Sequence, residues 1–316
     1  MSGLTTQKII KRKMTPWRDI KKNKGSYILA FPALVYVFIF SYCTLPYMFT
    51  AFQKFSYLTG LFNSEFIGLK NFEVFLSSPR AFQVTWNTIK LNFLFLLFGT
   101  MIAVFFAMII NEIYGKLFKK ISQSIFIFPH FLSWVIVSYV VLALFMSERG
   151  LVNQVLAVFG VDKIMWYNTS GPWTWILVGL RVWKGTGINT VIFLAAITAL
   201  DTTLYEAAYV DGANRFQRAI RITLPLIMPT VMTLTLLNLG RIFYGDFGMI
   251  YAIIRDNGVL FPTTDIIDTY VFRLLRRTGD PSQAMAVGMF QSILGFLLVL
   301  TTNTITQKYY EEGALF

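Results

Sequence analysis

The chain has 316 residues, of which 55% are hydrophobic, 17% aromatic and only 14% charged, and its mean hydropathy is +0.58. This composition lies outside the range of soluble globular proteins and indicates an integral membrane protein with one membrane domain. The net charge of +12 does not favour nucleic-acid binding, because the basic residues gather between apolar runs, as membrane topology requires.

The first 25 residues form a basic tail, and an uncharged stretch from residue 26 to residue 53 follows it. That stretch is long enough to span a bilayer and too long for the apolar core of a cleavable signal. Lys and Arg beside a span mark its cytoplasmic side, so we expect a cytoplasmic N-terminus. The basic residues of the tail are Lys8, Lys11, Arg12, Lys13, Arg18, Lys21, Lys22 and Lys24.

Five further apolar runs predict five further transmembrane helices, over residues 91–110, 121–146, 173–200, 224–244 and 284–304. The segments assigned to the outside carry short amphipathic helices, within residues 54–87, at 151–159 and near 265–275.

The predicted fold is therefore an all-α integral membrane protein with six transmembrane helices and both termini in the cytoplasm. Its six-helix domain covers residues 26–307, between tails at 1–25 and 308–316. Lys and Arg are more numerous in the segments assigned to the cytoplasm than in those assigned to the outside, which favours this topology. Arg273, Arg276 and Arg277 are exceptions, and we expect their segment to fold back as a surface helix.

Residues 201–224, here called the docking loop, are polar and helix-forming between two apolar runs. Thr203 and Glu206 have capping-box spacing, so we expect a helix to begin near Thr203. Ala207 and its neighbour Ala208 leave a bare face, and Gly212 lets the chain turn. The pattern predicts two short helices with a hinge near Gly212.

The second of these helices carries a cationic flank, because Arg215, Arg218 and Arg221 repeat every three residues. This flank would face a docking partner or anionic lipid headgroups. Pro225 fits the first turn of the next membrane helix, where its missing amide proton costs nothing. From spacing alone, an ordinary cytoplasmic loop between two spans is the alternative interpretation.

The spacing of Glu206-Ala207-Ala208, Gly212 and Ile222-x-Leu224-Pro225 resembles the EAA loop of bacterial ATP-binding-cassette importer permeases. In that family the loop is the docking site for the ATPase subunit. The resemblance implies that ATPase coupling involves Glu206, Ala207, Ala208, Asp211, Gly212, Ala213, Arg215, Leu224 and Pro225.

The resemblance continues along the chain. Stretches at residues 128–134, 182–185, 194–197, 262–270 and 286–292 are similar to those of polysaccharide-type permeases of carbohydrate importers. It implies a multi-pass subunit of a type I importer in the bacterial cytoplasmic (inner) membrane that moves oligosaccharides by alternating access. The implied partners are two ABC ATPase subunits, a second and homologous permease, and a periplasmic or lipid-anchored solute-binding protein.

No G-x-x-x-x-G-K-[ST] phosphate loop occurs in the sequence. We therefore expect no cofactor in this chain, with ATP and Mg bound by the partner ATPases, and we do not expect an enzyme. Cys43 is the single cysteine, which excludes a disulfide framework and a cysteine-based metal site. His130 stands alone in an apolar run, so a hydrogen-bonded packing role is favoured over a proton relay or a metal ligand.

Ionisable groups inside a span are costly and are expected to face a cavity or a polar partner. Counting ~1.5 Å per residue from Trp173 places Arg181 about 12 Å and Lys184 about 16 Å into the fourth span. Snorkelling of Arg241 to the surface, or neutralisation of the other two by the second permease, is the alternative. The predicted substrate pathway consists of Arg181, Trp183, Lys184, Asn189, Asn238, Arg241 and Tyr244.

Cationic groups in such a pathway would favour an acidic, uronate-containing oligosaccharide, although structural pairing explains the same charges. A permease for peptides or amino acids is the alternative within the importer class. An ion-coupled secondary carrier would need intramembrane carboxylates or inverted repeats, and the predicted spans hold almost no Asp or Glu. A membrane-embedded enzyme would need a catalytic constellation that this sequence does not contain.

Overall fold

A computed structural model describes residues 20–309 of the chain, and contacts between its residues divide it into two units, Met1–Phe49 and Thr50–Phe316. The first unit holds helix α2 (Lys24–Val37), which a π turn, η1 (Phe38–Tyr42), extends. The 3-10 helix η2 (Leu45–Phe52) follows at the boundary between the units. The whole run from Lys24 to Phe52 is long and apolar enough to cross a membrane, as predicted for residues 26–53.

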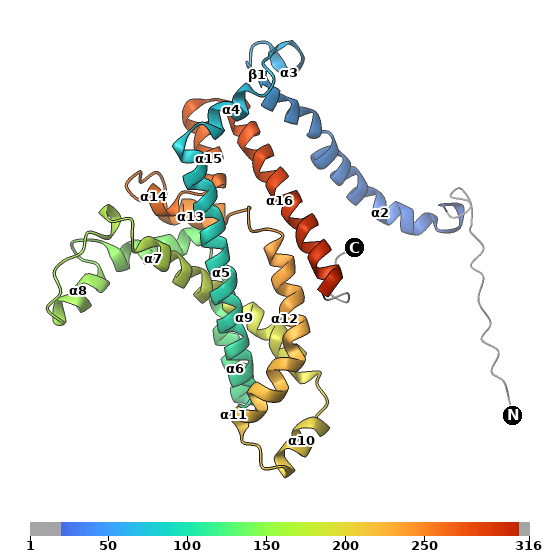
Figure 1. Ribbon diagram of the computed structural model, residues 1–316, viewed down its shortest axis with the longest axis vertical. Coiled ribbons are helices and arrows are strands. Elements are labelled where there is room, and N and C mark those ends of the chain that lie inside the picture. Colours follow the sequence, from blue (N-terminus) through green and yellow to red (C-terminus); the bar gives the residue numbers. More distant parts are fainter. Residues whose placement is uncertain (1–19, 310–316) are drawn as a thin grey trace. The chain divides into compact units, whose positions relative to one another are not determined.

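The second unit is built on four long helices: α5 (Pro79–Asn111), α9 (Trp173–Thr198), α12 (Leu224–Leu239) and α16 (Pro281–Tyr309). Helices α5 and α9 pack along each other and form the centre of this unit (Figure 1). Helix α5 begins at Pro79 because Pro suits the first turn and because the Ser78 hydroxyl accepts a hydrogen bond from the Arg80 amide at 3.3 Å.

Two apolar clusters hold the long helices together. The first joins Leu91 of α5 and Leu177 of α9 to helices α7 (Trp134–Phe145) and α13 (Phe247–Ile254). The second joins Ala103 of α5 and Phe193 of α9 to Ile227 of α12. Buried apolar side chains in contact across three helices fix the relative positions of those helices.

Helix α9 approaches α6 (Lys116–Ile127) so closely that the contact depends on a glycine. A Cβ at Gly187 would overlap the backbone carbonyl of Phe126. Small residues permit this kind of backbone-to-backbone packing between membrane helices.

The predicted third span is wrong as a single helix. Helix α6 leads into the 3-10 turn η3 (Phe128–Phe131), and α7 leaves that turn at a bend of 93°. The helix breaks because Pro129 stands at its end and Ser133 starts a new helix, accepting the Ile136 amide at 3.3 Å. Four helices in the part of the chain that is described are long and apolar enough to cross a membrane, or up to six if each bent pair is one span.

The predicted end of the fifth span at Tyr244 is also wrong, because α12 ends at Leu239. Residues 240–246, here called the break segment, have turn and irregular conformations before α13 begins at Phe247. The predicted second span begins earlier than expected, at Pro79, and the sixth corresponds to the candidate span Pro281–Thr304.

The short elements gather at the two ends of the long helices (Figure 1). At one end lie α4 (Lys70–Leu76), α14 (Phe261–Thr264), α15 (Ile267–Arg273) with the π turn η6 (Leu274–Thr278), and α3 (Gly60–Asn63) beside an antiparallel pair, β1 (Gln53–Lys54) and β2 (Glu65–Phe66). At the other end lie α10 (Thr203–Val210) and α11 (Arg215–Arg218).

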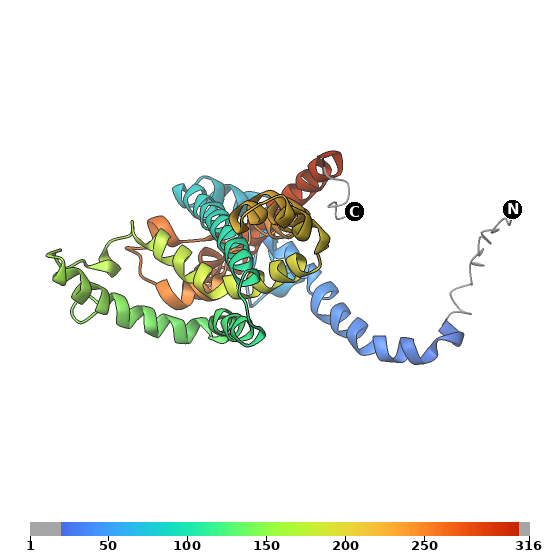
Figure 2. The ribbon, with the colours of Figure 1, turned by 90° about the horizontal axis from the view of Figure 1, so that it is seen from below.

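Helix α7 and the following helix α8 (Leu151–Val158) extend away from α5 as an arm, which Figure 2 shows from below. The 3-10 turn η4 (Trp166–Asn168) leads back from the arm to α9. The short helices predicted at 151–159 and 265–275 are thus present as α8 and α15, whereas α13 and α14 were not predicted.

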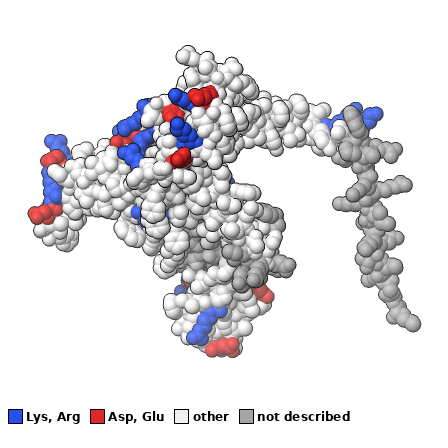
Figure 3. All heavy atoms as spheres, turned by 45° about the horizontal axis from the view of Figure 1, so that its top comes forward, with Lys and Arg blue, Asp and Glu red and all other residues white. Residues whose placement is uncertain are grey.

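Charged side chains on the face shown in Figure 3 gather near the ends of the second unit and at the tip of the arm. At the tip, Lys163 and Glu148 form an ion pair at 2.8 Å. The surface between these places is almost free of charge, as expected for a surface in contact with lipid.

Candidate functional site

A polar cavity of about 420 Å³ lies where α5, α9 and the turn η3 meet the break segment. The break segment contributes five of its residues, because the chain there leaves the helix and turns across the space beside α9. The lining residues are Asn92, Phe95, Leu96, Gly99, Thr100, His130, Arg181, Gly185, Thr186, Ile188, Asn189, Asn238, Arg241, Ile242, Tyr244, Gly245 and Asp246.

The charges of this cavity are unequally paired. Arg181 and Asp246 form an ion pair, with 3.7 Å between Nε and Oδ2. The other oxygen of Asp246 accepts the Met249 amide at 3.0 Å and so caps α13. This cap holds the carboxylate in place whether or not Arg181 is present. Arg241 has no ion pair among the described residues, so the cavity keeps one unpaired positive charge.

Polar groups without charge complete the lining. The Asn92 amide donates to the carbonyl oxygens of Ile242 at 2.8 Å and of Tyr244 at 3.1 Å. The Tyr244 hydroxyl donates to Ser292 at 3.3 Å. Thr186 is buried, and its hydroxyl has no hydrogen-bond partner among residues 20–309. A buried hydroxyl without a partner costs about 1–3 kcal/mol, which a bound hydroxyl group or water would recover.

Five of the seven residues predicted for the substrate pathway line this cavity: Arg181, Asn189, Asn238, Arg241 and Tyr244. Trp183 and Lys184 do not. Trp183 is half exposed on another face of α9, and the Lys184 ammonium donates to the His130 carbonyl at 3.0 Å and lies 5.0 Å from the Trp134 ring centre.

The packing role predicted for His130 is wrong, because its side chain is exposed and lines the cavity. Asn92 and Asp246 are the polar residues that sequence reasoning missed. A signal existed for both: Asn92 is an amide within an apolar run, and Asp246 stands where an N-cap residue would begin α13.

The docking loop, at the other end of the long helices, forms a second candidate functional surface. Helix α10 begins at Thr203 as predicted, but the predicted capping box is wrong, because the Asp201 carboxylate accepts the Thr203 amide at 2.9 Å. Gly212 has φ +78°, which confirms the predicted turn between two short helices. Asn214 and Gln217 form a capping box that starts α11.

Helix α11 runs through a π turn, η5 (Ala219–Thr223), into α12, so that one helical run extends from Arg215 to Leu239. Pro225 lies in the first turn of α12, as predicted. The wide turn before Pro225 lets the run pass a residue that cannot donate an amide hydrogen bond.

Polar contacts of Arg215 fasten the docking loop to the end of α5, and a further contact lies within the loop. Arg215 lies 4.0 Å from a carboxylate oxygen of Glu112, which ends α5, and donates to the Tyr114 hydroxyl at 3.1 Å. The hydroxyl groups of Tyr205 and Thr223 lie 2.9 Å apart and join α10 to η5, the turn that leads into α12. Arg215 is therefore committed to a contact within the chain and is not simply a free cationic flank.

The exposed surface of the docking loop combines charge with large apolar groups. Glu206 and Ala207 are exposed, Ala208 and Ala213 are half-buried, and Asp211 is exposed beside the turn. Val210, Phe216 and Tyr209 are exposed by 85%, 73% and 70%. An apolar patch with a polar rim on a loop outside the long helices marks a site of protein contact.

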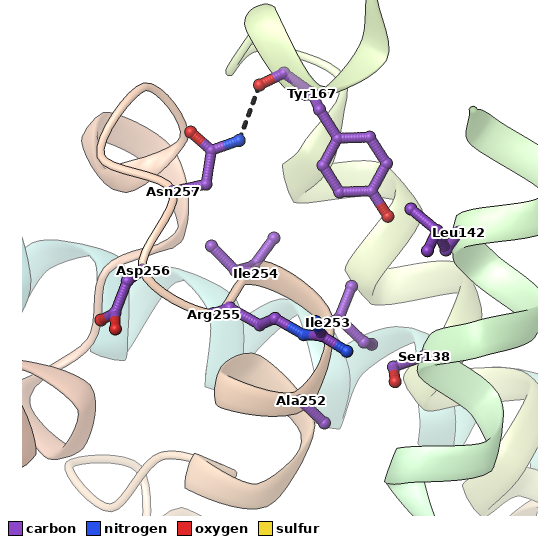
Figure 4. A pocket seen from close by; sticks show the side chains of 9 residues that line it. All are labelled: Ser138, Leu142, Tyr167, Ala252, Ile253, Ile254, Arg255, Asp256 and Asn257. Carbon is purple, nitrogen blue, oxygen red and sulfur yellow. Dashed lines mark hydrogen bonds between the residues drawn. The ribbon is translucent and has the colours of Figure 1, made fainter. Parts of the chain in front are cut away.

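A second cavity, of about 330 Å³, lies between α7, η4 and the end of α13 (Figure 4). Asn257 closes one side, its amide donating to the Tyr167 carbonyl at 2.8 Å. Arg255 enters it with φ +53°, a conformation that is costly for a residue with a side chain. Burial raises the pKa of the Tyr167 hydroxyl. No residue lines both this cavity and the polar cavity.

Comparison with known proteins identifies the architecture. Residues 96–312 match the family described as "Binding-protein-dependent transport system inner membrane component". The polygalacturonan/rhamnogalacturonan transport system permease protein YteP of Bacillus subtilis (strain 168) is 34% identical over 293 residues, which are 92% of this chain and 90% of YteP. Protein LplB of the same organism is 33% identical over 294 residues, 93% of this chain and 92% of LplB.

Among solved structures, a chain of a bacterial alginate ABC transporter in complex with an alginate pentasaccharide-bound periplasmic protein has a TM-score of 0.83 and 31% identity. The match covers 93% of this chain and 97% of that one. The family match covers more than half of the chain, and the similarity to YteP covers nearly all of it. The chain therefore belongs to the family of inner membrane components of binding-protein-dependent transport systems.

Proposed function

We propose that this chain is the permease subunit of an ATP-driven importer that carries acidic oligosaccharides, such as uronate oligomers, into a bacterial cell. The observation that carries this proposal is the polar cavity, in which Arg241 remains unpaired while Asp246 neutralises Arg181. The names of YteP and of the alginate transporter support an acidic sugar as the substrate class.

The chemistry of the cavity suits such a substrate. A guanidinium group binds a carboxylate through two parallel hydrogen bonds, and the amide groups of Asn189 and Asn238 would meet sugar hydroxyls. The Tyr244 ring offers an apolar face for a pyranose, and the unpartnered Thr186 hydroxyl would gain a hydrogen bond from a bound sugar. A volume of about 420 Å³ is within the range of small-ligand sites.

The energy for transport comes, in this proposal, from two partner ATPase subunits that bind ATP and Mg and dock on the docking loop. The chain itself is not an enzyme. A second, homologous permease completes the pathway, and a solute-binding protein delivers the sugar, as the complex of the alginate transporter with its periplasmic protein supports. Six spans with both termini in the cytoplasm, in the bacterial cytoplasmic membrane, follow from the same proposal.

The docking loop suits this coupling because the apolar patch around Val210 and Phe216 is exposed next to Glu206. Its contact with Glu112 leads to α5, its chain continues directly into α12, and both of these helices line the polar cavity. A movement of the docked ATPase would therefore reach the cavity through contacts within this chain.

The test is ATP hydrolysis by the complete complex in proteoliposomes, with its binding protein, across a panel of neutral and uronate oligosaccharides. Stimulation by uronate oligomers that is lost in Arg241→Ala is the expected result. Stimulation by neutral sugars that is unaffected by Arg181→Ala and Arg241→Ala would contradict the acidic substrate class. Uptake that proceeds without ATP would contradict the importer itself.

A further inference from the structure

The break segment, unlike the rest of the predicted fifth span, is not helical. Its first residues keep local turns, in which the amides of Gly240, Arg241, Ile242 and Tyr244 donate to carbonyls three or four residues earlier. The carbonyls of residues 242–244 and the Gly245 amide have no such local partner, and polar backbone between membrane helices needs a partner from the protein or from water in a cavity. The break segment also carries Arg241, Tyr244 and Asp246 into the polar cavity.

Three side chains from three other helices satisfy these three carbonyls and the Gly245 amide. Asn92 of α5 donates to the carbonyl oxygens of Ile242 and Tyr244, at 2.8 and 3.1 Å. Gln291 of α16 donates to the carbonyl oxygen between them, on Phe243, at 2.7 Å. Asp268 of α15 accepts the Gly245 amide at 2.8 Å. Asn92, Asp268 and Gln291 are here called the clamp.

The members of the clamp also hold each other. The Gln291 amide donates to the same Asp268 oxygen, at 3.1 Å, that accepts the Gly245 amide. Gln291 is 95% buried, and Asp268 is half-buried. A buried hydrogen-bond network that is fully satisfied rigidifies the groups it joins.

Steric packing fixes the segment from the same side. A Cβ on Gly245 would overlap the Ile266 side chain and would lie 3.0 Å from the Asp268 carboxylate. The segment therefore lies against α15 with no room for a side chain at this position. The next residue, Asp246, begins α13 and pairs with Arg181, so a shift at Gly245 would move the paired charge of the cavity.

We propose that Asp268 and Gln291 are positioning residues for transport: through the backbone of Phe243 and Gly245 they fix Arg241, Tyr244 and Asp246 in the geometry that binds substrate. The proposal rests on the proposed function of the cavity. Neither Asp268 nor Gln291 lines the cavity, so their influence reaches the substrate only through the break segment. The role of Asp268 is that of a hydrogen-bond acceptor, and its negative charge is not required.

The test compares Asp268→Ala with Asp268→Asn in the complete complex reconstituted in proteoliposomes. Asn keeps an oxygen acceptor for the Gly245 amide and the Gln291 side chain, whereas Ala removes it. Asp280→Ala is the matched control, because Asp280 likewise accepts one backbone amide, that of Gln283 at 2.9 Å, but touches no residue of the break segment. The readout is the number of sugar molecules imported per ATP hydrolysed, which a lower yield of folded complex does not change.

Asp268→Ala is expected to lower the number of sugar molecules imported per ATP about tenfold, because displaced binding groups slow the transfer of sugar steeply. The half-saturating concentration of sugar-loaded binding protein should stay unchanged. Asp268→Asn and Asp280→Ala should keep the wild-type ratio. Gly245→Ala, whose methyl group would clash with Ile266 and push the segment away from α15, should reproduce the loss. A wild-type ratio in Asp268→Ala, or equal losses in Asp268→Asn and Asp268→Ala, would overturn the positioning role. Absence of transport by the wild-type complex would instead refute the proposed function.

Discussion

Replacing Asp246 with Asn should make the polar cavity a stronger site for acidic sugars. The change removes the only carboxylate of the cavity lining and raises the net charge of Arg181, Arg241 and residue 246 from +1 to +2. Asn caps a helix as well as Asp does, so α13 should still begin at Phe247.

The cost to folding should be small. At 3.7 Å and an effective dielectric constant of about 20, the attraction between Arg181 and Asp246 is about 4 kcal/mol before screening. The two side chains are 42% and 24% exposed, so solvent reduces the net contribution to about 1 kcal/mol or less. For a sugar carboxylate about 7 Å from residue 246, the repulsion removed is about 2.4 kcal/mol at the same dielectric constant before screening. Solvent in the cavity reduces this gain to about 1 kcal/mol, or about fivefold in the dissociation constant.

The assay is equilibrium binding of a uronate trisaccharide and of a neutral trisaccharide to the purified complex. Asp246→Asn should tighten binding of the acidic sugar about fivefold and leave the neutral sugar unchanged. Asp162→Asn is the matched control, because Asp162 is exposed beyond the arm helix α8 and lines neither cavity. An equal change for both sugars, or none for the acidic one, would refute the electrostatic reasoning.

Three further outcomes are expected. Gly187→Ala should lower the thermal stability of the purified complex, by about 1–3 kcal/mol in free energy of unfolding, because the new methyl group overlaps the Phe126 carbonyl; an unchanged melting temperature would contradict the close packing of α6 and α9. Glu206→Lys should abolish sugar-stimulated ATP hydrolysis while membrane insertion, measured by the yield of protein in the membrane, stays normal; normal uptake would exclude Glu206 from coupling. Burial raises the pKa of Asp268, which lies outside the candidate spans, above its ordinary value of 3.8, since desolvation outweighs the hydrogen bonds to its carboxylate. The folded state then favours the protonated form, so the stability contributed by Asp268 falls as pH rises above about 3.8. Between about pH 4 and pH 8 the melting temperature of the wild type should therefore fall relative to that of Asp268→Asn. A difference in melting temperature that stays constant with pH would contradict this.

Hydropathy predicted most of the long helices, because an apolar run of about 20 residues forms a membrane-spanning α-helix, in which every backbone polar group is hydrogen-bonded. It failed where a helix breaks inside an apolar run. Pro129 and the Ser133 cap divide the predicted third span, and their signals are local, whereas the window that detects a span averages over them. Clamp contacts such as that from Gln291 to the Phe243 carbonyl stabilise the break segment. The sequence did not predict them, because a periodic pattern of apolar residues does not show which residues distant in sequence are in contact.

The candidate site was predicted in part for a related reason. A charge within an apolar run is conspicuous, so Arg181 and Arg241 were found without a structure. Asp246, the partner of Arg181, was missed, because it stands just beyond the predicted end of a span and has the appearance of a loop residue. Lys184 was predicted to face the substrate pathway and does not line the cavity. A charged group within a span can instead be satisfied by a backbone carbonyl that a helix break has left free, here the carbonyl of His130.

The docking loop is joined to two of the helices that line the polar cavity, α5 and α12. Arg215 contacts the end of α5 through Glu112 and also binds Tyr114, and the docking loop continues directly into α12 as one helical run. A force on the loop is thus divided between two helices that reach the polar cavity from different sides. If the Arg215 contacts were lost, a force on the loop would act on α12 alone, and α5 would stay still.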